Sequence, residues 1–176
     1  GLDQVKVYAF DAGTGKIVDK APLETVKGGG PRHLAFGKSS IYVLNEMGSS
    51  VSVFTAGKLV ETVNALPDGF TGASTAAEIV VDAKEKFLYS SNRGANTIAV
   101  FAIPHKAGEK LKKLADVAVG KVPRNFVLSP DGRFLLAAAQ DEDFVQVFGV
   151  DAKTGLLEKV GGQVSVPVPI CLRFPR

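Results

Sequence analysis

The segment Pro123–Phe148, PRNFVLSPDGRFLLAAAQDEDFVQVF, is the clearest indication of the fold, because the chain contains it three times in varied form. The other two copies are Pro31–Phe54 (PRHLAFGKSSIYVLNEMGSSVSVF) and Ala76–Phe101 (AAEIVVDAKEKFLYSSNRGANTIAVF). Each copy has an apolar run, a turn, a second apolar run, a polar gap and an alternating strand that closes on Phe. The closing residues, at positions 54, 101 and 148, are 47 residues apart. A period of this length, made of strands and turns, is typical of β-propeller blades.

The chain in order predicts an all-β fold of four-stranded antiparallel blades that form only part of a ring. We expect an outer half blade at residues 1–27, whole blades at 28–66, 67–120 and 121–165, and an inner strand of a further blade at 166–176, centred on Pro169–Phe174. The turn Asp11–Gly15 (DAGTG) recurs as Asp151–Gly155 (DAKTG), 140 residues or about three periods later, which supports the repeat. An open arc leaves apolar faces and unpaired strands exposed. The missing blades are therefore expected from a longer protein or from another chain.

Composition removes several classes of partner. The net charge is +3 and the pI about 9.0, but the 21 Lys and Arg residues are scattered and the longest run is Lys112–Lys113. A nucleic-acid surface needs a basic stripe with stacking aromatics, which the sequence lacks. It also shows no apolar stretch of membrane-spanning length and no secretion signal. We expect no nucleic-acid or membrane partner and a cytoplasmic location, with a periplasmic or secreted one as the alternative.

The sequence favours neither a metal nor a cofactor. Cys171 is the only cysteine, which excludes an intrachain disulfide, and its apolar neighbours predict a buried strand position. The two histidines, His33 and His105, have no carboxylates at an obvious metal-ligand spacing. We therefore expect the chain to function without a cofactor.

The repeated scaffold varies most informatively where its second strand ends, at Glu46, Arg93 and Gln140 in successive copies. In each blade the inner strand runs antiparallel to the second strand. The start of the inner strand and the end of the second strand therefore lie at the same face of the ring. Arg32 and Arg124 begin inner strands, so three arginines and Glu46 are expected to converge on one mouth. Arginine presents a planar fork to phosphate or carboxylate, which suits an anionic substrate. The alternative is a structural ion pair between Arg32 and Glu46.

Five short motifs resemble the seven-bladed lactonase family, whose members include bacterial 6-phosphogluconolactonase and fungal carboxy-muconate lactonizing enzyme. They are Gly30–His33 (GPRH), Asn45–Glu46 (NE), Ser91–Arg93 (SNR), Pro123–Arg124 (PR) and Ser129–Arg133 (SPDGR). The resemblance covers essentially the whole chain and implies that it corresponds to the C-terminal half of a seven-bladed ring.

The resemblance implies catalytic roles for Arg32, Glu46 and Arg93. It implies substrate-binding positions near them, for which we take Arg124, Gln140, Asn45 and His33; for the last three, a polar strand end or a satisfied loop carbonyl is the alternative. The family's proposed cluster also contains a histidine in the blade before this chain begins, and His33 is not that residue. Either Glu46 or the absent histidine would then act as the base. Two flanking arginines should depress the pKa of Glu46, so electrostatic positioning is equally open for it.

The resulting hypothesis is a lactonase-like hydrolase of carbohydrate metabolism that opens an anionic sugar lactone such as 6-phosphogluconolactone. We expect it to need the missing N-terminal half, as a partner chain or a clipped half of the same protein, and the isolated piece to be inactive; self-association is the other partner considered. The alternatives are a non-catalytic propeller fragment that binds a small anion or a protein, and a muconate-type lactonizing isomerase.

Overall fold

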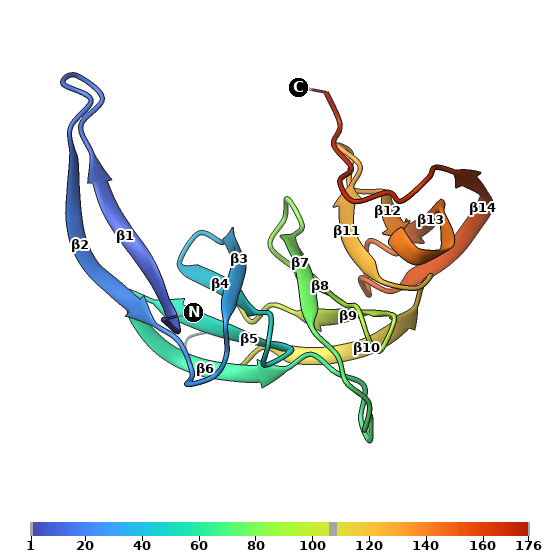
Figure 1. Ribbon diagram of the computed structural model, residues 1–176, viewed down its shortest axis with the longest axis horizontal. Helices are drawn as coiled ribbons and strands as arrows, with labels where there is room; N and C mark the ends of the chain where they lie inside the picture. The colour runs from blue at the N-terminus through green and yellow to red at the C-terminus, as the bar shows by residue number, and fades with distance from the viewer. Residues whose placement is uncertain (1, 106–108, 176) are drawn as a thin grey trace.

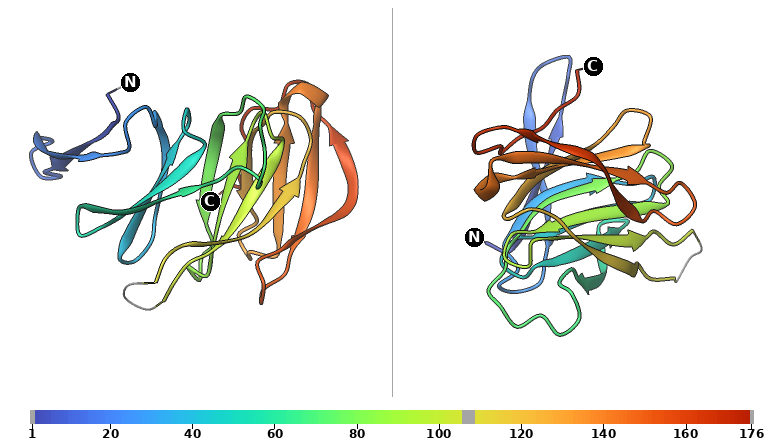
Figure 2. Two further views of the ribbon diagram at one scale, coloured as in Figure 1. Left: turned by 90° about the horizontal axis from the view of Figure 1, so that it is seen from below. Right: turned by 90° about the vertical axis from the view of Figure 1, so that its right-hand side faces the viewer.

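A computed structural model describes residues 2–105 and 109–175 as four antiparallel sheets that follow one another in an arc (Figures 1 and 2). The first sheet is a hairpin of β1 (Gln4–Phe10) and β2 (Ile17–Glu24). The other three have four strands each, in chain order: β3 (Pro31–Phe36), β4 (Ser40–Asn45), β5 (Ser50–Thr55) and β6 (Lys58–Asn64); β7 (Ala76–Val81), β8 (Phe87–Asn92), β9 (Thr97–Ala102) and β10 (Lys112–Ala118); β11 (Pro123–Leu128), β12 (Phe134–Ala139), β13 (Phe144–Val150) and β14 (Leu157–Ser165). A short 3₁₀ helix, η1, spans Gln140–Glu142. The predicted all-β, partial propeller is confirmed.

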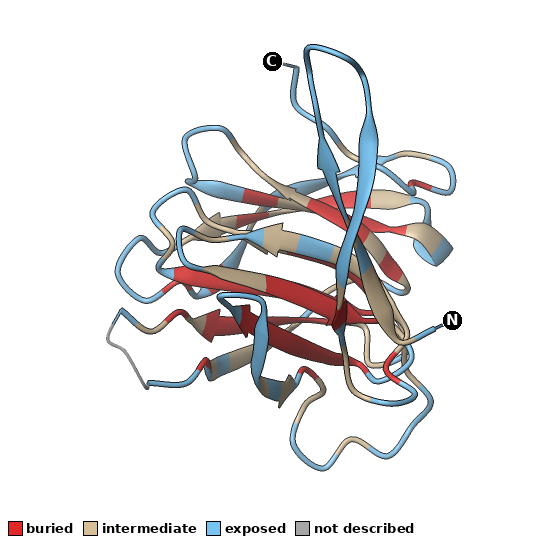
Figure 3. Ribbon diagram, turned by 90° about the vertical axis from the view of Figure 1, so that its left-hand side faces the viewer, coloured by how far each residue is buried: buried red, intermediate tan, exposed pale blue. Residues whose placement is uncertain are grey.

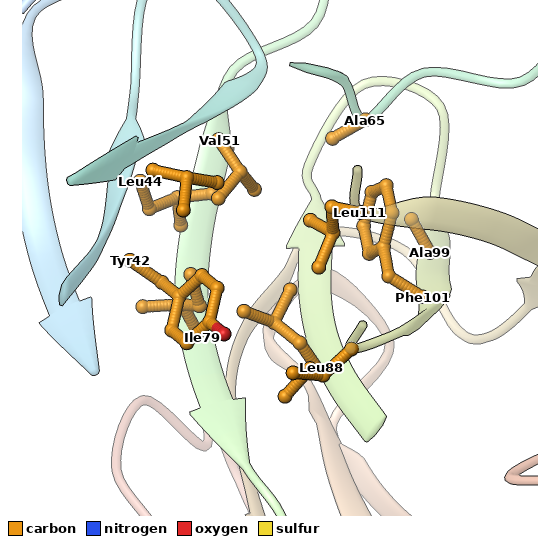
Figure 4. Packing of buried hydrophobic residues seen from close by; sticks show 12 residues of the cluster. Tyr42, Leu44, Val51, Ala65, Ile79, Leu88, Ala99, Phe101 and Leu111 are labelled. Atoms are coloured by element: carbon orange, nitrogen blue, oxygen red, sulfur yellow. The ribbon is translucent and has the colours of Figure 1, made fainter. Parts of the chain in front are cut away.

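The core lies between the sheets, because successive side chains of a strand point to opposite faces. In β8, Leu88 packs toward β3–β6, in a cluster with Tyr42, Leu44 and Phe101 (Figure 4). Its neighbour Tyr89 packs the other way, in a cluster that includes residues of β11–β14. The middle blade is therefore buried on both faces, and every residue of β8 is buried.

The two ends of the arc are much less covered. The β1–β2 hairpin stands out from the rest of the structure and is mostly exposed (Figure 3). It leaves Tyr8, Phe10 and Ile17 exposed, while Leu23 packs on Val43 and Phe54 of the next blade. Exposed apolar side chains that gather in this way mark a surface that packs against another segment or chain.

The predicted strand Pro169–Phe174 does not form: residues 166–175 contain no strand. A strand requires a partner for its backbone groups, and no described strand lies where the second strand of that blade would pair. The prediction that Cys171 is buried is wrong for the same reason, because its side chain is exposed.

The two related turns fold alike. The Asp11 carboxylate accepts hydrogen bonds from the amides of Gly13 (2.9 Å) and Thr14 (3.1 Å). The Asp151 carboxylate likewise accepts hydrogen bonds from the amides of Lys153 and Thr154, both at 2.8 Å. Such Asx turns compete with sheet pairing and reverse the chain, so the same local chemistry starts the outer strands β2 and β14.

Candidate functional site

The backbone places equivalent side chains at one end of the three complete blades. The amide of the residue after the second strand donates to the carbonyl of the residue before the inner strand in each blade: Glu46 to Gly30 (2.7 Å), Arg93 to Thr75 (2.8 Å) and Gln140 to Val122 (3.2 Å). These three side chains therefore leave the scaffold from the same position, as the period of 47 residues predicts.

Each inner strand begins with a β-bulge. The pairing register shifts by one residue between Pro31 and His33 in β3, between Ala76 and Ile79 in β7, and between Pro123 and Asn125 in β11. A bulge leaves one residue outside the ladder and re-aims its side chain. The residue so released in β3 is Arg32, and in β11 it is Arg124.

Arg32, Glu46 and Arg93 form one charged cluster across two blades, which we call the Arg–Glu–Arg cluster. Glu46 Oε2 accepts a hydrogen bond from Arg32 Nη1 at 3.4 Å, and Glu46 Oε1 accepts one from Arg93 Nη2. Both arginines are also fixed by the inner strand of the middle blade, because Arg32 Nε donates to Ala77 O (3.0 Å) and Arg93 Nη2 to Ala76 O (3.3 Å). The side chains are 15 to 28% exposed, so solvent and a ligand can reach them.

The cluster sets the ionisation of Glu46. Partial burial favours the neutral acid and raises its pKa, but the hydrogen bond from Arg93 and the positive charges of Arg93 and Arg32 oppose it. The arginines prevail, so the pKa of Glu46 lies below its ordinary value of 4.5. The cluster therefore carries two positive charges and one negative charge at neutral pH, as the flanking arginines predict.

The other predicted site residues do not join the cluster. Asn45 is completely buried and its amide donates to Ser50 (3.0 Å) and Ser52 (2.9 Å), so it holds the blade together rather than lining a mouth. Gln140 opens η1 and donates to Asp141 at 3.2 Å. Arg124 makes no side-chain hydrogen bond or ion pair with any residue that the structure describes. Sequence reasoning placed Arg124 and Gln140 by period and Asn45 by its motif, and neither fixes the direction of a side chain.

His33 lies beside the cluster and bonds to a residue that sequence reasoning missed. Its Nδ1 is 2.9 Å from Oε1 of Glu78, a buried carboxylate in β7. Asn125 of β11 bonds to the other oxygen of Glu78. One signal could have found Glu78: it is a charged residue in a run, AAEIVV, that otherwise reads as a buried strand.

No metal centre coincides with the cluster in the described part of the chain. Within residues 2–105 and 109–175, no group of three or more His, Cys, Asp or Glu side chains is placed to hold a metal ion. A hollow of about 500 Å³ lies near Tyr42, Glu61 and Leu111, and includes none of the predicted site residues. Among the described residues no helix has the length and apolarity to cross a membrane.

The structure is thus a partial β-propeller with two arginines and a glutamate gathered at one end of its inner strands. The family described as lactonase, seven-bladed β-propeller, matches residues 1–174. The chain therefore belongs to this family, and the resemblance stated from its motifs is confirmed.

Relatives of known name agree with this assignment. A 6-phosphogluconolactonase of Bacillus subtilis (strain 168) is 33% identical over 182 residues, covering 99% of this chain and 52% of the relative. Among solved structures, a protein from Lactobacillus plantarum superposes with a TM-score of 0.92 at 30% identity, covering 99% of this chain and 53% of the other. A periplasmic gluconolactonase from Pseudomonas aeruginosa gives 0.87 at 31% identity, with coverages of 97% and 50%. The chain thus spans about half the length of the relatives it matches.

Proposed function

We propose that this chain forms part of a lactonase that opens an anionic sugar lactone, with 6-phosphogluconolactone as the first substrate to test. The observation that carries the proposal is the position of Glu46 between Arg32 and Arg93, at an end of the blades where the backbone repeats and only the side chains differ. The names of the relatives, 6-phosphogluconolactonase and gluconolactonase, support the same class of reaction.

The arginines have the chemistry that such a substrate requires. Lactone hydrolysis joins a water oxygen to the carbonyl carbon, passes through an oxyanion, and breaks the ring C–O bond. The water loses its proton to a base, and the ring oxygen gains one as it leaves. Each guanidinium has five N–H donors, and only part of each set is used by Glu46 and the β7 carbonyls. The remaining donors are available to a phosphate or carboxylate and to the developing oxyanion.

Glu46 has two possible parts in this reaction. Its depressed pKa makes it a weak base at neutral pH. We therefore assign it first to electrostatics: it holds both arginines in place and limits how tightly an anionic product is retained. The remaining blades would supply the rest of the mouth, including the histidine that the family resemblance places there.

The test begins with the protein as isolated. A denaturing gel with intact mass shows whether a second chain accompanies this one, and lactone hydrolysis is then measured against the spontaneous rate. In an active preparation, Arg93→Ala should lower the rate by about 10²–10³-fold, the cost of losing an oxyanion donor. Arg133→Ala is the matched control, because Arg133 lies on an exposed turn, where it pairs with Asp131 and has no contact with the cluster among the described residues. Equal rates for both variants would remove the cluster from the reaction.

The second candidate function is anion binding without turnover. One observation favours it: the cluster in this chain is net positive, while the histidine that the family resemblance implies as a base lies outside the chain. Titration with 6-phosphogluconate, the stable open product, distinguishes the two. The outcome that supports binding without catalysis has two parts: Arg93→Ala weakens the binding of 6-phosphogluconate, and hydrolysis does not exceed the spontaneous rate even when a companion chain is present.

A further inference from the structure

A chain of hydrogen bonds crosses the inner strands of the blades. His33 in β3 bonds through Nδ1 to Glu78 Oε1 in β7 at 2.9 Å. Glu78 Oε2 accepts from Asn125 Nδ2 in β11, and Asn125 Oδ1 accepts from the backbone amide of Leu172 at 2.7 Å. The members are separated by 45, 47 and 47 residues. One position of the repeat supplies the three side chains, and the backbone of the following segment supplies the last donor.

The donors and acceptors in this chain can be assigned from its far end. A backbone N–H only donates, so the atom of Asn125 that faces Leu172 must be the carbonyl oxygen. The NH₂ group of Asn125 then faces Glu78, which must accept. The other carboxylate oxygen accepts from the backbone amide of Ile79 at 3.0 Å. Both oxygens of Glu78 therefore accept hydrogen bonds. A carboxylate has no proton to give, so with Glu78 as a carboxylate His33 Nδ1 is the donor in their contact.

Burial makes this assignment rigid. Glu78 is 6% exposed and Asn125 4% exposed, and a buried carboxylate is stable only when donors surround it. The side chain of His33, in contrast, is 41% exposed. The imidazole is therefore anchored through Nδ1 to the buried carboxylate, and Nε2 forms no hydrogen bond with a described residue.

The bulge in β3 places this imidazole beside the Arg–Glu–Arg cluster. Arg32 and His33 are consecutive, yet both reach the same strand: Arg32 donates to Ala77 O and His33 to the Glu78 carboxylate. Regular strand geometry would send two consecutive side chains to opposite faces, and the extra residue between Pro31 and His33 removes that alternation.

We propose that Glu78 is a positioning residue that holds neutral His33 as the Nδ1–H tautomer, so that Nε2 is a proton acceptor next to Arg32. For its role in catalysis this rests on the proposed lactonase function, and it makes His33 the base in place of the histidine outside this chain: Nε2 accepts the proton of the water whose oxygen bonds to the lactone carbonyl. The resulting imidazolium returns that proton to the ring oxygen when the C–O bond breaks. No further reactant is needed.

The tautomer can be measured without any activity. The chain has two histidines, and His105 is exposed, so it serves as the reference within the same molecule. We would label the histidines with ¹⁵N and record long-range ¹H–¹⁵N spectra well above the pH at which free histidine titrates. In the unmodified chain, neutral His33 should show a protonated Nδ1 and an unprotonated Nε2. A predominantly Nε2–H form would overturn the proposal before any variant is made.

Two variants test the assignment by changing the hydrogen-bond partners of His33. Glu78→Gln replaces one acceptor oxygen by NH₂, so one of the surrounding donors must face a donor, and the exclusive Nδ1–H signal should be lost. Adding Asn125→Asp restores the pattern: the new Gln NH₂ donates to the introduced carboxylate, which still accepts from Leu172, and the Gln oxygen again faces His33. The double variant should therefore recover the Nδ1–H tautomer, while His105 stays unchanged throughout. An unaltered His33 signal in the single variant would refute the role of Glu78.

In an active preparation, the same pair separates positioning from simple stability. Glu78→Gln should lower kcat at least about 10-fold with little change in KM, and the double variant should recover most of it. In serine-protease triads, converting the carboxylate that fixes the histidine tautomer to its amide lowers kcat by about 10⁴-fold, which sets the upper bound. If the tautomer behaves as stated but kcat does not change, His33 is fixed by Glu78 without serving the reaction, and the proposed function stands or fails on the arginine variants alone.

Discussion

Replacing Glu46 by Gln should strengthen anion binding while it weakens turnover. The carboxylate contacts both arginines of the cluster, so an anion held by their free donors lies within about 6 to 7 Å of it. At that separation, with an effective dielectric constant of about 40 to 80 for a partly exposed site, each unit of negative charge is repelled by about 0.6 to 1.4 kcal/mol. Removing the charge should therefore tighten binding of 6-phosphogluconate about 3-fold to 10-fold for each unit of negative charge that it places at this distance.

The assay is isothermal titration calorimetry with 6-phosphogluconate at two salt concentrations. The gain in affinity should shrink at high salt, because counterions screen a partly exposed pair. Glu158→Gln is the matched control, since Glu158 is an exposed residue of the outer strand β14. It makes the same charge change away from the cluster and should leave the dissociation constant unaltered.

Two results would contradict this reasoning. Unchanged or weaker binding in Glu46→Gln would mean that the anion does not lie beside the cluster, or that Glu46 is needed to hold the arginines in place. Turnover that stays unchanged in an active preparation would remove Glu46 from the mechanism, even if binding tightens as expected.

Three further predictions concern stability. Leu88→Ala removes a completely buried side chain between two blades and should lower the free energy of unfolding by about 2 to 5 kcal/mol in a denaturant titration; a loss below about 1 kcal/mol would mean that these blades do not pack as described. Gly155→Ala should cost more than Gly132→Ala, because both glycines have φ near +70° but only at Gly155 would the new Cβ meet another side chain, at 2.4 Å from the Phe87 ring; equal melting temperatures for the two variants would place Phe87 elsewhere. Because the folded pKa of Glu46 is depressed, its ionised form contributes stability above about pH 4.5 that is lost as pH falls through the lower folded value. Glu46→Gln should therefore show a shallower acid loss in melts recorded from pH 6 to pH 3, and parallel profiles would show that the ion pairs add nothing.

The sequence was sufficient to predict the blades and the meeting of Arg32, Glu46 and Arg93. Both follow from the repeat: a fixed period of strands gives the position of each strand, and positions one period apart lie side by side in neighbouring blades. The contact between Arg93 and Glu46 spans 47 residues, the length of one repeat. The predicted strand Pro169–Phe174 failed because its own sequence pattern does not supply the pairing partner that a strand requires.

Glu78 was missed because the middle blade departs from the motif that marks the other two. Its inner strand reads AAEI where they read PRHL and PRNF, so alignment by motif found no counterpart of Arg32 there. In the structure this strand joins the site through its backbone, because the carbonyls of Ala76 and Ala77 accept from Arg93 and Arg32. A motif of side chains does not record such contacts.

The β-bulges explain why periodicity could locate the site residues but not orient them. A single added residue at the start of each inner strand reverses which face the next side chain takes, and no residue type in these segments indicates it. In β3 the bulge turns both Arg32 and His33 toward β7, so the guanidinium of Arg32 and the imidazole of His33 both contact that strand. In β11 the same bulge leaves the Arg124 side chain without a hydrogen bond to a described residue, while Asn125 takes the contact with Glu78. Because the bulge is common to these blades, what separates Arg32 from Arg124 is the neighbouring acceptor: Ala77 O and Glu46 accept from Arg32, and no described residue accepts from the Arg124 side chain.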